Sequence, residues 1–190
     1  MRTDAEQATA EALAGGVRFF QYRAKRASRR AVHAVCARLA PLLRDAGAVF
    51  VVNDHADIAA AVDADGVHLG QDDLPVRDAR KVLGRNRIIG ISTHSIEQAR
   101  TAAEEGADYI GFGPVFSTAT KDAGPIQGVE ALGSVCKAVG IPVVAIGGIN
   151  DRTAGAAALA GARGIAVISA VLSSEDISAS SRRIAAAFGQ

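Results

Sequence analysis

The sequence has no tryptophan, only two cysteines and no excess of charge of either sign. Cys36 and Cys136 lie far apart, in segments with helical patterns, and lack the spacing of a metal site. We therefore expect two buried, reduced thiols rather than a disulfide or a catalytic pair. With 21 basic and 20 acidic residues the net charge is +1. This balance gives no electrostatic reason to expect binding to nucleic acid or to a membrane surface.

Long apolar runs are also missing. No unbroken run reaches the length of a membrane span, and the acidic start with Asp4, Glu6 and Glu11 is unlike a signal peptide. We expect a cytoplasmic enzyme without membrane contact. At 190 residues, 49% of them hydrophobic, the chain is long enough for a substantial core, so we assign residues 1–190 to one domain. The sequence allows a homo-oligomer but does not set the oligomeric state.

Aromatic residues make up only 4% of the chain, whereas alanine and glycine are abundant. Short, nearly continuous apolar runs alternate with amphipathic stretches, which indicates parallel strands covered by helices. Strands are expected at residues 17–22, 49–52, 66–69, 87–91, 109–112, 142–146 and 164–168. Helices are expected at residues 1–14, 28–46, 56–62, from 75 onward, 96–105, 129–139, 152–160 and 177–188.

This order of elements best matches the TIM barrel, an eightfold (β/α) barrel. A doubly wound open sheet ranks second, because no G-x-G-x-x-G fingerprint follows the first strand. The pattern contains seven strands and begins with a helix, so the first barrel strand is missing. Of two explanations, a misplaced start at Met1 and an imperfectly closed barrel, we favour the misplaced start.

In such a barrel the functional residues follow the carboxyl ends of the strands. After the first strand, Gln21, Arg23 and Lys25 are spaced by two and point the same way in an extended chain. An amide and two cations at the barrel mouth suit a pyrophosphate clamp. Taken alone, this segment is read equally well as a solvated basic stretch.

The next two strand ends carry carboxylates. Asp54 follows Asn53, and Asp72 and Asp73 follow His68. Two carboxylates on neighbouring strand ends, together with substrate phosphates, are how proteins usually hold Mg²⁺. One of the two later aspartates can instead cap the helix that follows. A histidine on an apolar strand is more often a hydrogen-bonded core residue than a metal ligand, and we read His68 in that way.

The remaining strand ends carry hydroxyl groups and glycines. The Ser92 hydroxyl follows a strand, and the sequence fits two roles equally well: contact with a ligand, or a hydroxyl at a turn or helix start. Residues 111–121 combine two glycines, a proline, hydroxyl side chains and Lys121, which suit phosphate oxygens. Gly147 and Gly148 let the backbone approach a phosphate, and Ser169 adds a hydroxyl. One mouth with two phosphate sites and a metal pair predicts a transferase.

The motifs at these strand ends, in order over residues 15–172, resemble those of the thiamine-phosphate synthase family: Gln21-x-Arg23-x-Lys25, Asn53-Asp54, His68-Leu-Gly-Gln-Asp-Asp73, Ser92, Gly113-Pro114, Thr118-Ala-Thr-Lys121, Gly147-Gly148 and Ile168-Ser169. This resemblance implies that a hydroxymethylpyrimidine diphosphate is joined to a thiazole ethyl phosphate. Thiamine phosphate and pyrophosphate would be the products, and Mg²⁺ the cofactor.

The resemblance also implies roles for individual residues. The catalytic side chains would be Arg23, Lys25, Ser92 and Lys121, and the Mg²⁺ ligands Asp54 and Asp73. The pyrimidine diphosphate would be bound by Gln21, Arg23, Lys25, Asn53, Ser92 and Lys121. The thiazole phosphate would be bound by Thr118, Ala119, Thr120, Gly148, Ile168 and Ser169.

Two alternatives are weighed against this function. The related thiazole tautomerase branch is similar in fold and in its thiazole-phosphate loops, but it would not need a diphosphate clamp and a metal pair. A truncated, ligand-binding pseudoenzyme is suggested by the missing strand, yet every expected functional side chain is present. The motifs favour the synthase over both.

Overall fold

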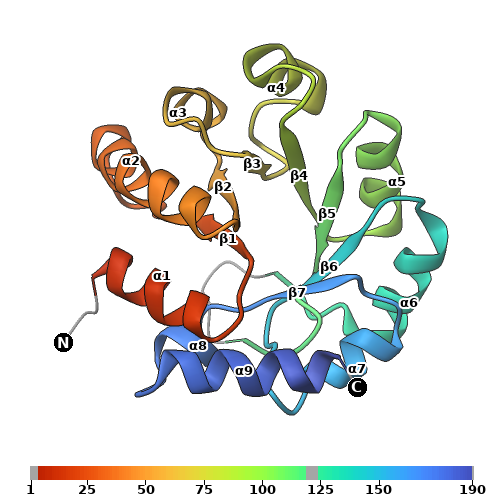
Figure 1. The fold of residues 1–190 in the computed structure, drawn as a ribbon. Coiled ribbons are helices and arrows are strands. Elements are labelled where there is room, and N and C mark those ends of the chain that lie inside the picture. The colour runs from red at the N-terminus through yellow and green to blue at the C-terminus, as the bar shows by residue number, and fades with distance from the viewer. Residues whose placement is uncertain (1–3, 119–123, 190) are drawn as a thin grey trace.

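Seven parallel strands form one sheet in the computed structural model, which describes residues 4–118 and 124–189. Their spatial order equals their sequence order, and each strand pairs in parallel with the next. The strands are β1 (Phe19–Tyr22), β2 (Val49–Asn53), β3 (Gly66–Leu69), β4 (Ile88–Thr93), β5 (Tyr109–Phe112), β6 (Val143–Ile146) and β7 (Gly164–Ala166). The sheet curls into most of a barrel, and helices surround it (Figure 1).

The helices alternate with the strands, as the apolar pattern predicts. They are α1 (Ala5–Ala14), α2 (Arg29–Asp45), α3 (Ala56–Ala61), α4 (Val76–Leu83), α5 (Ile96–Glu104), α6 (Gly128–Ala138), α7 (Ala154–Leu159), α8 (Ser169–Leu172) and α9 (Ile177–Phe188). The free cysteines lie on α2 and α6, Cys36 buried and Cys136 partly buried. None of the helices in the described ranges is both long and apolar enough to cross a membrane.

Local chemistry explains where several helices begin. The Ser28 hydroxyl accepts a hydrogen bond from the backbone N–H of Ala31 at the start of α2. Asp176 does the same for Ala179 at the start of α9. Such caps satisfy N–H groups that have no partner inside the helix. Along α2 the buried side chains recur at helical spacing and turn one face to the sheet: Val32, Cys36, Leu39, Ala40 and Leu43.

The sheet is open between β7 and β1, its two edge strands. The helices nevertheless meet across this opening, because α1 packs against α9 (Figure 1). A Cβ at Gly15, just after α1, would lie 2.6 Å from Cβ of Ser181 on α9, so only glycine permits this approach. The predicted TIM-barrel fold lacking one strand is confirmed. In the described residues the opening is confined to the sheet.

Two boundaries near the chain's end differ from the prediction. The strand expected at 164–168 ends at Ala166, because Ile168 already caps α8. This four-residue helix was not predicted. The helix expected at 152–160 spans Ala154–Leu159, because the residues before it form a turn. In that turn Asn150 accepts a hydrogen bond from the backbone of Arg152 at 2.9 Å.

Candidate active site at the carboxyl ends of the strands

The carboxyl end of β2 places Asp54 at the barrel mouth. Its φ angle is 65°, a left-handed conformation that aspartate tolerates better than most residues. The Asp54 N–H donates to the carbonyl of His68 on β3 at 2.8 Å, and His55 N–H donates to the carbonyl of Asn53 at 2.9 Å. The turn therefore fixes the backbone of Asp54 against the neighbouring strand.

Asp73 meets Asp54 from the loop after β3. One carboxylate oxygen of Asp73 accepts the Gly70 N–H at 2.7 Å, which anchors the side chain within its own loop. Burial raises the pKa of Asp54, and the hydrogen bond and the charge of Asp73 raise it further. Lys25 and Arg23 act in the opposite direction. The structure thus brings together the two predicted metal ligands and two predicted cations.

The Asp54–Asp73 pair suits a hard divalent cation. Two partly buried carboxylates that face each other repel when both are ionised, and a cation between their oxygens would remove that repulsion. Within residues 4–118 and 124–189, no group of three or more His, Cys, Asp or Glu side chains could hold a metal ion. Two carboxylates completed by substrate phosphate oxygens are a usual arrangement for Mg²⁺.

Gln21, Arg23 and Lys25 follow one face of β1 and its extension. All three are exposed, whereas the intervening Tyr22 and Ala24 are partly buried against the core. The predicted alternation is confirmed. Exposed cations beside the Asp54–Asp73 pair form a site with charges of both signs, which favours a ligand that carries phosphate together with a metal ion.

A chain of polar side chains crosses the barrel interior and contains the predicted site residue Ser92. His68 Nε2 lies 2.9 Å from the Ser92 hydroxyl, and Nδ1 lies 2.8 Å from the Tyr109 hydroxyl. Burial lowers the pKa of His68 to about 4, so its ring is neutral at pH 7. The interpretation of His68 as a hydrogen-bonded core residue is confirmed.

Tyr109 is the residue of this chain that sequence reasoning missed. It lies in a continuous apolar strand, where a tyrosine is expected to be an ordinary residue of the hydrophobic core. The signal that points to it is Gly90 on β4, which pairs with Tyr109 in the sheet register. A side chain at Gly90 would overlap the Tyr109 ring. Gly111 similarly leaves room for the ring of His68. It lies within β5, not in the phosphate loop where it was expected.

The loop after β5 is joined to the loop after β6. Val115 N–H donates to the carbonyl of Ile146 at 2.9 Å, and Phe116 N–H donates to that of Gly147 at 3.1 Å. Gly147 and Gly148 have φ angles of 84° and 69°. Added side chains there would overlap the 114–117 segment, so both glycines serve close packing between the two loops.

The rest of the predicted thiazole-phosphate site surrounds these joined loops. Thr118 ends the described part of the β5 loop, and Ala119, Thr120 and Lys121 lie outside the described residues. Ile168 is 55% exposed and caps α8, which begins at Ser169. A short helix after the last strand, with its start at the barrel mouth, is a common phosphate-binding arrangement in TIM barrels.

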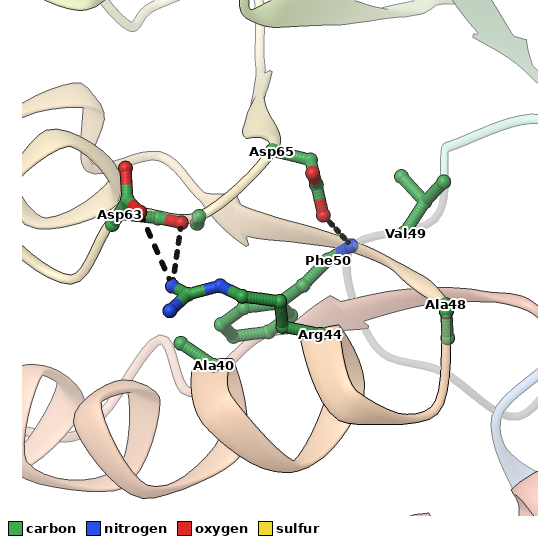
Figure 2. A pocket seen from close by; sticks show the side chains of 9 residues that line it. Ala40, Arg44, Ala48, Val49, Phe50, Asp63 and Asp65 are labelled. Carbon is green, nitrogen blue, oxygen red and sulfur yellow. Dashed lines mark hydrogen bonds and ion pairs between the residues drawn. The ribbon is translucent and has the colours of Figure 1, made fainter.

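A hollow of about 230 Å³ lies at the opposite end of the strands, before β2 and β3 (Figure 2). Its polar groups are bonded to one another. Asp65 accepts the Phe50 N–H at 2.7 Å, and Arg44 pairs with Asp63 at 3.2 Å. Polar groups that bond one another at the amino ends of barrel strands contribute to stability. We therefore do not place the active site there.

The fold defines a class: a TIM-barrel-like (β/α) protein, here with paired carboxylates and cations at the carboxyl ends of its strands. The family model described as thiamine monophosphate synthase matches residues 2–171. The chain therefore belongs to the thiamine monophosphate synthase family.

Individual relatives agree with the family model. Thiamine-phosphate synthase of Chloroflexus aurantiacus is 47% identical over 176 residues, which are 92% of this chain and 81% of the relative. The thiamine-phosphate synthase of Methanospirillum hungatei is 49% identical over 180 residues, which are 94% of this chain and 87% of the relative. These relatives confirm the prediction of a thiamine-phosphate synthase, a transferase, and do not favour the tautomerase.

Solved structures support the same assignment. Thiamine phosphate pyrophosphorylase from Pyrococcus furiosus superimposes with a TM-score of 0.92 at 41% identity, over 99% of this chain and 91% of that chain. Orotidine 5′-phosphate decarboxylase from Pyrococcus horikoshii reaches 0.72 at 16% identity. That second likeness concerns the fold alone.

Proposed function

We propose that the chain joins 4-amino-2-methyl-5-hydroxymethylpyrimidine diphosphate to 4-methyl-5-(2-phosphoethyl)thiazole, releasing pyrophosphate and forming thiamine phosphate. The observation that carries this proposal is the Asp54–Asp73 pair with Arg23 and Lys25 beside it. Such a site is matched to a diphosphate bound with a metal ion. A single phosphate would not require both the cations and the carboxylates.

The reaction needs charge neutralisation more than a protein nucleophile. If pyrophosphate leaves first, the C–O bond to the diphosphate breaks with its electron pair, and a pyrimidine-methyl cation forms. The thiazole nitrogen then donates its lone pair to the methylene carbon. Arg23 and Lys25 neutralise the departing pyrophosphate, and Lys121, assigned through the family motif, completes the set of cations.

Mg²⁺ would be held by Asp54 and Asp73. When bound, it supplies Lewis-acid stabilisation of the charge that develops on the leaving diphosphate. The two carboxylates would hold the positive charge of the metal ion at the ends of β2 and β3. Arg23 and Lys25 approach from β1, so the diphosphate would be contacted from two sides.

The second substrate would occupy the joined loops after β5 and β6. Thr118, Ala119, Thr120, Gly148, Ile168 and Ser169 are assigned to its phosphate. Asn53, Gln21 and Ser92 are assigned to the pyrimidine diphosphate. Holding both reactants at one mouth converts an encounter of two molecules into a step within one complex, which accounts for much of the acceleration expected of such an enzyme.

Product analysis tests this function directly. Purified protein with both substrates and Mg²⁺ should form thiamine phosphate, identified by its mass and by the fluorescence of its oxidised form. Omitting either substrate should abolish the product. With thiazole phosphate alone, the tautomerase alternative predicts interconversion of thiazole isomers. That result, without thiamine phosphate in the complete mixture, would refute the proposed function.

A further inference from the structure

Three side chains from three strands form a continuous hydrogen-bonded chain inside the barrel. Tyr109 on β5 bonds His68 on β3, and His68 bonds Ser92 on β4. Tyr109 and His68 are buried, with exposed fractions of 8% and 7%. Ser92, at the end of the chain, is more accessible and is assigned to the pyrimidine diphosphate.

The interior is built around the two rings. Gly90 and Gly111 leave the space that the Tyr109 and His68 rings occupy, since a Cβ at Gly90 would overlap Tyr109 and one at Gly111 would lie 3.3 Å from Cε1 of His68. Phe19 holds Tyr109 from a third direction through an edge contact with ring centroids 5.5 Å apart. The rings are therefore fixed in position, which fixes the two hydrogen bonds of the imidazole.

The chain has a direction, because a neutral imidazole has one donor and one acceptor nitrogen. Among the described residues, the buried Tyr109 hydroxyl has one hydrogen-bond partner, Nδ1 of His68. Its proton is therefore donated to Nδ1, since otherwise a buried O–H would be left without an acceptor. The ring proton must therefore be on Nε2, which donates to Ser92 Oγ. This leaves the Ser92 O–H to donate to a ligand.

The chemistry of the substrate fits the same direction. A pyrimidine diphosphate offers many acceptors, its phosphate oxygens and ring nitrogens, and one donor, its amino group. Ser92 can bind the acceptors only as a donor. With the opposite order of bonds its proton would be held by His68 Nε2, and its oxygen would meet an acceptor.

We propose that Tyr109 and His68 are positioning residues, which hold the Ser92 hydroxyl as a hydrogen-bond donor to the pyrimidine diphosphate. This inference rests on the proposed function for the identity of the ligand. Neither positioning residue needs to touch the substrate. Both act through Ser92.

The tautomer of His68 tests this direction without any substrate. Nitrogen NMR of the wild-type protein at pH 7 should show His68 with its proton on Nε2, the signal being assigned by its loss in His68→Gln. A proton on Nδ1 would overturn the proposal. Because this measurement uses the free protein, it stands whether or not the enzyme makes thiamine phosphate.

A double-mutant cycle tests the action through Ser92. Tyr109→Phe, which removes one hydroxyl and keeps the ring, should lower kcat/KM for the pyrimidine diphosphate about 5- to 10-fold. In a background of Ser92→Ala the same change should cause no further loss. Losses that multiply would overturn the proposal, because a purely structural role gives independent effects.

The chain supplies a matched control for this cycle. Tyr22 is the other tyrosine and lies on the opposite face of β1, packed against the core. Tyr22→Phe should leave kcat/KM unchanged. An equal loss in Tyr22→Phe and Tyr109→Phe would show that the hydroxyl at 109 has no particular function and would contradict the assignment.

Discussion

At the scale of single residues, the proposed metal site rests on the carboxylate pair of Asp54 and Asp73. Asp54 is held in a left-handed conformation by bonds to β3, and Asp73 is anchored by the Gly70 N–H. The backbone of Asp54 and the side chain of Asp73 are thus constrained before any ligand arrives. Asp72 is exposed, whereas Asp73 is partly buried and faces Asp54. This geometry distinguishes two neighbouring aspartates that the sequence could not.

The neighbours Asp72 and Asp73 give a matched test of the metal site. Asp73→Asn should raise the Mg²⁺ concentration for half-maximal activity at least about tenfold, because it removes one of two carboxylate ligands. Asp72→Asn should change it less than about twofold. Activity is measured across a Mg²⁺ titration at saturating substrates. Equal shifts in the two variants would show that the metal is not held as proposed.

His68 should make stability depend on pH. Its pKa falls from the ordinary 6.5 to about 4 in the folded protein, so below pH 6.5 the unfolded chain binds a proton that the folded chain does not. The stabilisation is complete above pH 6.5 and is lost as the pH falls toward 4, by about 3 kcal/mol at most.

Urea unfolding at pH 7 and pH 4.5 checks this expectation. The fall in the free energy of unfolding should be smaller in His68→Gln than in the wild type. His33→Gln, on an exposed position of α2, is the control and should follow the wild type. Parallel pH dependences for all three proteins would contradict the assignment of a buried neutral ring at His68.

At the scale of elements, two loops act as one unit. The loops after β5 and β6 share backbone hydrogen bonds, and Gly147 permits this contact with its φ of 84°. A change in one loop therefore alters the other. The proposed thiazole-phosphate site depends on both, so its shape is set by a contact between segments far apart in the sequence.

Gly147→Ala tests this joined unit. The new Cβ would lie 2.5 Å from Cβ of Pro114 and would sit on a backbone that side chains rarely adopt. We expect a loss of at least about 2 kcal/mol in the free energy of unfolding and a higher KM for the thiazole phosphate. Denaturant unfolding and steady-state kinetics measure both.

The control for this variant is Gly140→Ala, because nothing lies within 4 Å of a Cβ placed there and its φ is not positive. That change should leave both the stability and the KM close to those of the wild type. If Gly147→Ala behaved like Gly140→Ala, the two loops would not depend on the contact that joins them.

The sequence predicted the elements well because their signals are local. Apolar runs predicted all seven strands of the described sheet, and the amphipathic stretches between them predicted the longer helices. It missed α8, since four residues are too few to show helical periodicity, and Ile168 therefore read as strand. It also missed the link between Tyr109 and His68, because contacts across a barrel interior leave no pattern along the chain.

At the scale of the whole molecule, helices close a ring that the sheet leaves open. The packing of α1 on α9 joins the two sides of the opening between β7 and β1 (Figure 1). The residues that carry the proposed chemistry come from both sides of this opening, with Gln21 on the edge strand β1 and Ser169 after the other edge strand, β7. The site therefore depends on the ring as a whole.

The most direct test of this account follows phosphorus in the complete reaction. In ³¹P NMR, the protein with both substrates and Mg²⁺ should convert the pyrimidine diphosphate and the thiazole phosphate into pyrophosphate and thiamine phosphate in equal amounts. Chelating the metal with EDTA, or replacing Asp54 in Asp54→Asn, should slow both products together. If the diphosphate stayed intact, or if pyrophosphate appeared without thiamine phosphate, the central claim would be contradicted.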